Sequence, residues 1–395
     1  MGRLIAYLIA TALLFAFAEG FSSPVVIIGK VIIDEYGDPS KSEAPALSIG
    51  GGGPQAAFGA ACGMAVRDCF DADGNRKLEF DDLHFPPCMP VAFLGAVGND
   101  WSDDDTEALR SLIGPALAVC PVLVQSDDHI TPRIRLWHDE SQNIQWYAVN
   151  ASFGPSGADG LWRNRPSAND ILAVLDERSD DTDDENAAAA SLHMIVEAGE
   201  GAAGGGLDSE PLRNSQLLER ISFVGVEPIA FINDAEGKVS ATDAASCVRL
   251  MESLPRLDVL CPDNDLQSSL QDIGHDRGTY HIVTRNGPRG SILYESGRGD
   301  DDKSHMMGKR VPAATLATSD GQPVNPTGAG NAYSGALSAL LGTGSDLLEA
   351  ATIATGVGAA VCEFKNLPPY SWETLERIRD ASDEVREKLK ATKKD

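Results

Sequence analysis

Residues 325–337 read NPTGAGNAYSGAL and place a bend of small residues directly before apolar residues at helical spacing. Glycine at the start of a helix lets backbone N–H groups approach an anion closely, and the helix dipole adds a favourable potential. The stretch therefore predicts a phosphate-binding turn at Gly328, Ala329 and Gly330, followed by a buried helix. Tight packing of a helix on a sheet favours the same small residues, so this turn needs support from the rest of the chain.

Upstream of this turn, short apolar runs alternate with helical stretches. Residues 24–37 (PVVIIGKVIIDEYG) are expected to form one buried first strand, and residues 47–65 a glycine-rich bend with a helix of small residues. An amphipathic helix is expected at about 104–112. Further apolar runs bounded by turn residues predict strands at 90–100, 170–175, 192–199, 221–231, 257–263 and 280–294. This alternation predicts an α/β fold with a mostly parallel central sheet and helices on both faces.

Three segments are expected to lie outside that body. Residues 129–150 alternate apolar and polar side chains around a polar turn, which predicts a hairpin that forms a small β lid. The composition of residues 71–86 and 199–210 indicates flexible insertions.

The bulk composition limits the functions open to the chain. Its 395 residues carry a formal net charge of −27, so the surface would repel a phosphate backbone, and we expect no nucleic-acid partner. Residues 1–20 place one Arg before an apolar stretch that ends in small residues, which is the layout of a signal peptide. A short membrane anchor is the alternative, but the apolar stretch is shorter than the roughly 20 residues of a span. We expect no membrane span after the signal is removed.

A signal peptide predicts entry into the secretory pathway. The seven cysteines are scattered without a C-x-x-C pair, which is typical of reduced thiols rather than of a disulfide framework. The final compartment stays open between secretion, the endoplasmic reticulum and an organelle reached through it.

Several motifs resemble, in the same order, those of the ribokinase-like (PfkB) carbohydrate kinases. NPTGAGNAYSGALSALL resembles the family's C-terminal signature, whose usual form is DTTGAGD before a small, apolar helix. VVIIGKVIIDEYG and SIGGGGPQAAFGAACG resemble its first strand and its substrate loop. FLGAVGNDW, LDVLCPDNDL and IVTRNGPRGSILY resemble its G.VG.D, PN.xE and T.G..G elements. The matches span about residues 25–340 and look closest to a divergent eukaryotic branch.

The resemblance implies a ribokinase-like three-layer sandwich over residues 21–395 and a set of site residues. Those expected to bind substrate are Asp34, Gly50, Gly51, Gly52 and Gln55, the last at a position where the family often has Asn. The backbone of Gly328, Ala329 and Gly330 would form the anion hole that stabilises the transferring phosphoryl group, and Thr284, Gly287 and Gly290 would lie near the nucleotide. A purely structural role stays an alternative for each residue outside the GAG turn.

Asn331 departs from the family pattern, which places a catalytic Asp at this position. A carboxylate accepts the proton of an attacking hydroxyl, whereas an amide has no comparably basic lone pair at neutral pH. The loss of a general base typically costs roughly 10²- to 10⁴-fold in rate, while positioning and the anion hole can survive.

The cofactors that the resemblance implies are ATP and Mg²⁺. The family's acidic position that helps to organise Mg²⁺ falls on Leu266, with Asp263 and Asp265 offset from it. A small change of register would restore a carboxylate there, so Asp263 and Asp265 are the candidate metal residues.

Asn331 leaves three interpretations open. The chain is a slow kinase that uses water or a displaced acid such as Asp320, or a kinase whose substrate ionises easily, or a pseudokinase that binds nucleotide or sugar as a sensor or scaffold. The first two predict transfer of the ATP γ-phosphoryl group to a hydroxyl of a sugar, polyol or nucleoside. The resemblance also allows a homodimer.

Residues 71–82 (DADGNRKLEFDD) imitate the opening of a calcium-binding loop, with oxygen donors at Asp71, Asp73, Asn75 and Asp82. Arg76 stands where the sharp turn of such a loop requires Gly, and no partner loop is present elsewhere. A polar hairpin is therefore the preferred interpretation, and a calcium-responsive structural protein is a weaker one.

Overall fold

The computed structural model describes residues 24–37, 46–71, 73–80, 83–125, 130–138, 144–148, 166–179, 190–197, 210–229, 231–233, 238–240, 252, 254–262, 281–295, 308–316, 325–364 and 366–392. The proposed signal peptide and nearly all of the insertion at 199–210 lie outside these residues and stay predictions.

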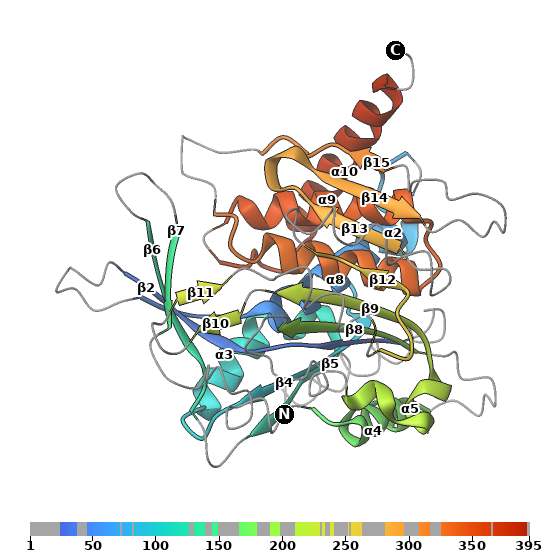
Figure 1. The fold of residues 1–395 in the computed structure, drawn as a ribbon. Helices are drawn as coiled ribbons and strands as arrows, with labels where there is room; N and C mark the ends of the chain where they lie inside the picture. Colours follow the sequence, from blue (N-terminus) through green and yellow to red (C-terminus); the bar gives the residue numbers. More distant parts are fainter. Residues whose placement is uncertain are drawn as a thin grey trace, which may run out of the picture.

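Nine of the described strands form one central sheet in the order β15-β14-β13-β12-β9-β8-β1-β4-β5 (Figure 1). In that order the strands are Lys309–Val311, Ser291–Glu295, His281–Arg285, Val259–Leu260, Ile221–Ile229, Ala190–Glu197, Val25–Ile28, Met89–Val97 and Leu117–Gln125. From β13 to β5 every neighbouring pair is parallel, and β14 and β15 add an antiparallel edge. The mostly parallel sheet predicted from the apolar runs is confirmed.

Helices cover both faces of this sheet, so the body has three layers. The helices are α2 Gly52–Cys69, α3 Asp103–Ile113, α4 Ala168–Ser179, α5 Ser215–Arg220, α8 Ala329–Gly342, α9 Leu347–Cys362 and α10 Trp372–Thr392. Short 3-10 turns are η1 Leu78–Phe80, η2 Gly114–Ala116, η5 Glu210–Arg213 and η7 Gly287–Arg289. One apolar core lies between the sheet and α2, α8, α9 and α10, and a second lies between the opposite face and α4 and α5 (Figure 1).

The predicted first strand is in fact two strands in two different sheets. β1 ends at Ile28, and β2 begins at Ile32 in a second, four-stranded sheet. Gly29 allows the break, because a Cβ there would lie 2.6 Å from Gly53 Cα. The prediction of one buried strand was wrong because the apolar run of β1 resumes at Val31 and continues into Ile32 and Ile33 of β2, so the run of side chains does not mark where the chain leaves the central sheet.

The predicted strand at 170–175 is part of helix α4. Ser167 and Asp170 form a reciprocal cap, with Ser167 N donating to Asp170 Oδ2 at 2.7 Å and Asp170 N donating to Ser167 Oγ at 3.3 Å. Ile171, Val174 and Leu175 are buried and follow helical spacing. An apolar run of this length does not distinguish a strand from one face of a buried helix.

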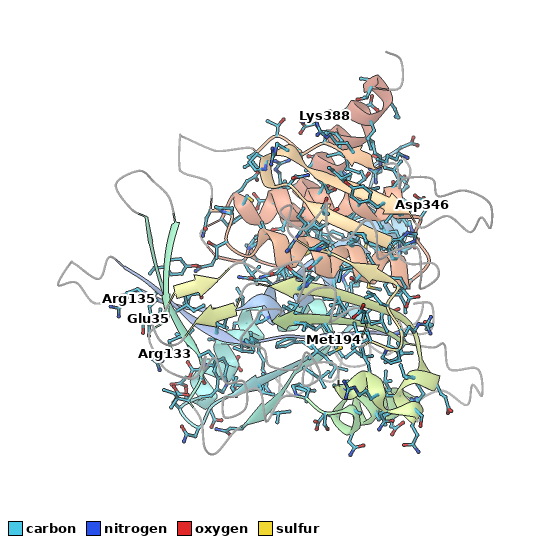
Figure 2. All side chains as sticks on the ribbon, viewed as in Figure 1. Glu35, Arg133, Arg135, Met194, Asp346 and Lys388 are labelled. Atoms are coloured by element: carbon cyan, nitrogen blue, oxygen red, sulfur yellow. The ribbon has the colours of Figure 1, made fainter. Side chains whose placement is uncertain are left out.

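The second sheet is the lid, with strand order β3-β2-β6-β7. Its strands are Ala46–Gly50, Ile32–Tyr36, Arg133–His138 and Ile144–Ala148, and a separate antiparallel pair is formed by β10 Phe231–Asn233 and β11 Lys238–Ser240. β6 and β7 are the hairpin predicted at 129–150, but β2 and β3 make the lid larger than predicted. Glu35 and Arg135 pair across neighbouring lid strands, with Arg135 Nη2 2.6 Å from Glu35 Oε2 (Figure 2).

Thr131 and Asp100 join the lid to the body. Thr131 N donates to Asp100 Oδ1 at 2.6 Å, and Gly98 N donates to Thr131 Oγ1 at 3.0 Å. Arg133 on β6 adds a hydrogen bond to Asp100 Oδ2. The lid strand that carries Asp34 is therefore held over the carboxyl end of β4.

Candidate active site

The packing of α2 against α8 brings two glycine-rich helix starts together. A Cβ at Gly59 would lie 2.0 Å from Ala332 O, and one at Gly335 would lie 2.1 Å from Ala56 O. Gln55 of α2 meets Asn331 of α8, Gly59 meets Ala332 and Gly63 meets Ala336, so the helices run side by side in the same direction. The small residues of the opening motif therefore serve the packing as well as the turn, and both interpretations of them hold.

Gly328 forms the start of α8. Its φ of 83° is in the left-handed region, and a Cβ there would lie 2.4 Å from Gln55 Cδ on α2. No side chain caps this helix. Ala329 N donates to Pro326 O at 3.2 Å, so one N–H of the predicted turn already has a backbone partner, and the anion-binding role of the turn stays a prediction.

Asn331, in the first turn of α8, is fixed by a neighbour from the substrate loop. Its Nδ2 donates to Gln55 Oε1 at 2.6 Å, and a Cβ at Gly52 would lie 3.5 Å from the same Nδ2. The structure thus brings together the predicted base position and the predicted substrate loop. The amide is neutral, so this position supplies a hydrogen-bonding group and no general base.

Asp34 is a buried carboxylate beside that loop. Its side chain is 7% exposed, and no hydrogen-bond donor from the described residues reaches it. Gly50 lies directly against it, because a Cβ there would be 1.9 Å from Asp34 Oδ2. Burial raises the pKa of Asp34 to about 7. A buried carboxylate that no described donor reaches still has its acceptor capacity, and the substrate-binding role of Asp34 stays a prediction.

Tyr36, two residues along β2, links the lid to the loop before α8. Its hydroxyl forms a hydrogen bond with Asn325, whose Oδ1 accepts from Thr327 N at 3.1 Å. Burial and then the charge of Asp34 raise the pKa of Tyr36, so its hydroxyl stays protonated. The lid strand with Asp34 is thereby joined to the turn with Gly328.

Three residues at the site were missed by sequence reasoning: Glu227 on β9, Arg285 on β13 and Ser334 on α8. Arg285 Nη1 pairs with Glu227 Oε1, and Ser334 Oγ donates to Glu227 Oε2. Ser334 Oγ also lies 3.0 Å from the backbone oxygen of Asn331. The sequence did contain a signal, because each charge interrupts a predicted buried strand, but only the fold shows that the two charges face each other.

His193 on β8 lies deeper beneath α8. It is fully buried, and neither ring nitrogen has a hydrogen-bond partner among the described residues. A Cβ at Gly225 would lie 3.2 Å from its Nδ1 and 2.3 Å from Ser338 Oγ. Burial, and then the positive charge of Arg285, lower the pKa of His193 to about 3. The imidazole is therefore neutral, and Arg285 is the cation of this region.

The predicted nucleotide-side residues lie at the turn between β13 and β14. Thr284, inside β13, is fully buried, and its hydroxyl has no hydrogen-bond partner in the described part of the chain. Gly287 and Gly290 have φ values of 52° and 85°, and a Cβ at Gly290 would lie 2.0 Å from Val311 O. The turn geometry alone requires these glycines, so the structural alternative has direct support at Gly290.

The metal predictions fall largely outside the described residues. Asp263, Asp265, Leu266 and Asp320 are not among them. Within the described part of the chain, no group of three or more His, Cys, Asp or Glu side chains is arranged to hold a metal ion.

Asp71, in the calcium-like stretch, caps its own turn, because its Oδ1 accepts from Asp73 N at 3.0 Å and Asn75 N at 2.8 Å. Phe70 and Arg76 pair as antiparallel neighbours, which is the polar hairpin that the sequence favours. Asp82 is not described, so calcium binding here stays untested.

Comparison with known proteins identifies the fold. No family model and no curated protein matches the sequence. Among solved structures, ribokinase from Giardia lamblia is 17% identical with a TM-score of 0.54, covering 91% of this chain and 100% of that one. Arabidopsis thaliana ribokinase complexed with ribose and ATP is 13% identical, with a TM-score of 0.53 and coverage of 91% and 99%. A nucleoside kinase of Methanocaldococcus jannaschii, titled an archaeal member of the ribokinase family, is 13% identical, with a TM-score of 0.54 and coverage of 91% and 100%.

These likenesses confirm the ribokinase-like fold that the motifs predicted, and the low identities fit a divergent chain. No described helix is both long enough and apolar enough to cross a membrane.

Proposed function

We propose that this chain, which has the ribokinase-like fold, is an ATP-dependent phosphotransferase that phosphorylates a hydroxyl of a sugar, polyol or nucleoside. The observation that carries the proposal is the meeting of three features: the start of α8, which has no side-chain cap among the described residues, the glycine-rich start of α2, and the carboxylate of Asp34, which no described donor reaches. An anion-binding turn beside a hydroxyl-binding carboxylate is what phosphoryl transfer to an alcohol requires. The solved structures support the same class, since one holds ribose with ATP and another is a nucleoside kinase.

In this proposal the chain's own residues orient the reactants. Ionised Asp34 accepts hydrogen bonds from substrate hydroxyls, and the turn at Gly328–Gly330 receives the terminal phosphoryl group. Mg²⁺ bound to the phosphates would neutralise their charge, and Asp263 and Asp265 stay its proposed ligands. The new bond joins the substrate oxygen to phosphorus, the bond to the leaving diphosphate breaks, and the hydroxyl proton is released.

Asn331 makes this kinase slow, because no base receives that proton at its side chain. The alternative is a pseudokinase that binds nucleotide or sugar without turnover. The hydrogen bond from Asn331 to Gln55 favours it, since a neutral amide pair now occupies the position of the base.

The test is ADP release from Mg-ATP across a panel of sugars, polyols and nucleosides, with Asn331→Asp assayed beside the natural chain. Gln55 is an amide, so it can turn its Nε2 toward the new carboxylate, and we expect a gain of roughly 10²- to 10⁴-fold in substrate-dependent turnover. Asp34→Asn is the matched control and should abolish the substrate dependence of both chains.

Slow, substrate-dependent release by the natural chain supports the kinase. Turnover by Asn331→Asp alone, with nucleotide binding by both proteins, identifies a pseudokinase. Loss of turnover in Asp320→Asn would show that Asp320 is the displaced acid.

We also propose that residues 1–20 are a cleaved signal peptide that directs the chain into the secretory pathway. N-terminal sequencing of the mature protein from cells tests this, since an intact residue 1 contradicts cleavage.

A further inference from the structure

Arg285 ends β13 with its guanidinium against the first turn of α8. A Cβ at Gly330 would lie 2.6 Å from Arg285 Nη1 and 3.3 Å from its Cζ. Gly330 therefore leaves the space that the guanidinium occupies. The Arg285 side chain is 11% exposed, so it is largely but not completely enclosed.

The electrostatics of this placement call for an anion. The N-terminus of a helix carries about half a positive charge, so a cation beside it is repelled. Glu227 supplies one negative charge to Arg285, but the same carboxylate also accepts a hydrogen bond from Ser334. Among the described side chains that contact this turn, Arg285 carries a positive charge and Asn331 adds none, so the guanidinium and the positive end of the helix lie together there.

The DTTGAGD signature that this stretch resembles has an Asp where this chain has Asn331, so the two can be compared in charge. An Asp at position 331 would offset the positive potential and repel a phosphate, whereas Asn331 does neither. Asp34, beside the substrate loop that contacts this turn, is an independent sign of a ligand site, since it is more than nine-tenths buried and no donor from the described residues reaches it.

We propose that Arg285 is a phosphate-binding residue, and that it donates to the same phosphate group that the Gly328–Gly330 turn receives. Glu227 positions Arg285 from below, and Gly330 keeps the path between guanidinium and phosphate clear. The inference rests on the proposed function only in taking that phosphate to be part of ATP; it requires binding and not turnover.

The competing explanation is that Arg285 merely neutralises the buried Glu227. Both explanations predict that loss of Arg285 alone destabilises the fold, so stability does not separate them. The affinity for phosphate-bearing ligands does, provided that the variant stays folded.

The experiment is calorimetric titration of ATP and adenosine into the natural chain, into Arg285→Lys and into the double variant Glu227→Gln with Arg285→Met. The double variant removes both charges at once, and Gln keeps an oxygen for Ser334. A hydrogen bond to a charged group contributes about 1.5–3 kcal/mol, so we expect ATP affinity to fall by roughly 10- to 100-fold in the double variant. Adenosine affinity should be unchanged, and Arg285→Lys should give an intermediate loss for ATP only.

Equal ATP affinity in the natural chain and the folded double variant would overturn the inference and leave the proposed function intact. ATP binding that depends on Arg285 without any turnover would support the inference while the kinase proposal fails. A natural chain that binds adenosine and ATP equally overturns the role of Arg285, and one that binds neither overturns both proposals.

Discussion

Two buried carboxylates at this site, Asp34 on the lid and Glu227 on the body, differ in their hydrogen-bond and ion-pair partners. Glu227 is fully buried and has both a cation and a hydroxyl donor. Asp34 is 7% exposed and has no donor among the described residues, so its pKa rises to about 7. The body carboxylate is paired within the fold, whereas no described donor reaches the lid carboxylate. The difference between the two makes Asp34, and not Glu227, the carboxylate to test as a ligand-binding group.

The largest expected effect tests the ion pair between Glu227 and Arg285 in the body. Arg285→Met leaves the fully buried Glu227 without its cation, and breaking a buried pair in this way costs about 3–5 kcal/mol of the free energy of unfolding. Adding Glu227→Gln should recover most of that loss, because no unpaired charge is then left. Urea unfolding of the two single variants and the double variant gives the coupling; additive losses would show that the two charges do not depend on each other.

Replacing the Asp34 carboxylate with a neutral amide is expected to stabilise the fold, by an amount that depends on pH. The pKa of Asp34 is raised from 3.8 to about 7, so the folded state retains a proton that the unfolded state loses between these values. Stability therefore falls as the pH rises through this window, by about 4 kcal/mol at most. Asp34→Asn should equal the natural chain below pH 4, exceed it in stability at pH 8 and lose substrate binding.

Asp100 is the matched control for this titration. Burial would raise its pKa, but hydrogen bonds from Thr131 and Arg133 outweigh burial and lower it. Asp100→Asn should therefore lose stability at neutral pH, and the difference should vanish as the pH falls below the ordinary range for Asp. Chemical denaturation across pH 3–8 measures the free energy of unfolding of both variants. If Asp34→Asn and Asp100→Asn changed it with the same sign at neutral pH, the difference between the two carboxylates would be contradicted.

The local patterns of the sequence were enough to predict the sheet, the glycine-rich helix starts and the position of Asn331. The site's charges were not predictable in the same way. Glu227 and Arg285 are 58 residues apart in sequence and meet only because β9 and β13 are neighbours of β12. The position of Asp34 on the lid was not predicted, because the apolar residues of β1 and the first two residues of β2 form one nearly continuous apolar run. Contacts that depend on strand order cannot be predicted from local sequence patterns.

The meeting of the two glycine-rich helix starts depends on the α2–α8 contact. Gly335→Ala would place a Cβ 2.1 Å from the backbone oxygen of Ala56, which no rotamer change relieves. Forcing extra volume into a packed core costs about 1–3 kcal/mol, and we expect the upper end here together with a loss of both ATP and substrate binding. Gly358→Ala is the control, since its nearest contact would be an ordinary 3.5 Å from Ala329 O. Equal thermal stability of the two variants would show that the helices are not in close contact.

The smallest expected change in stability comes from Gly330→Ala, and it separates the binding role of Arg285 from its structural role. The new methyl group would meet Arg285 Nη1 at 2.6 Å, and the end of a flexible side chain is able to move aside. Alanine also favours a helix over glycine by about 1 kcal/mol, which offsets the cost of that movement. The free energy of unfolding should thus change by less than about 1 kcal/mol, while ATP affinity falls because the guanidinium no longer lies on the turn. Unchanged ATP affinity in this variant would mean that the guanidinium has no phosphate to bind, and that the body carboxylate and its cation serve the fold alone.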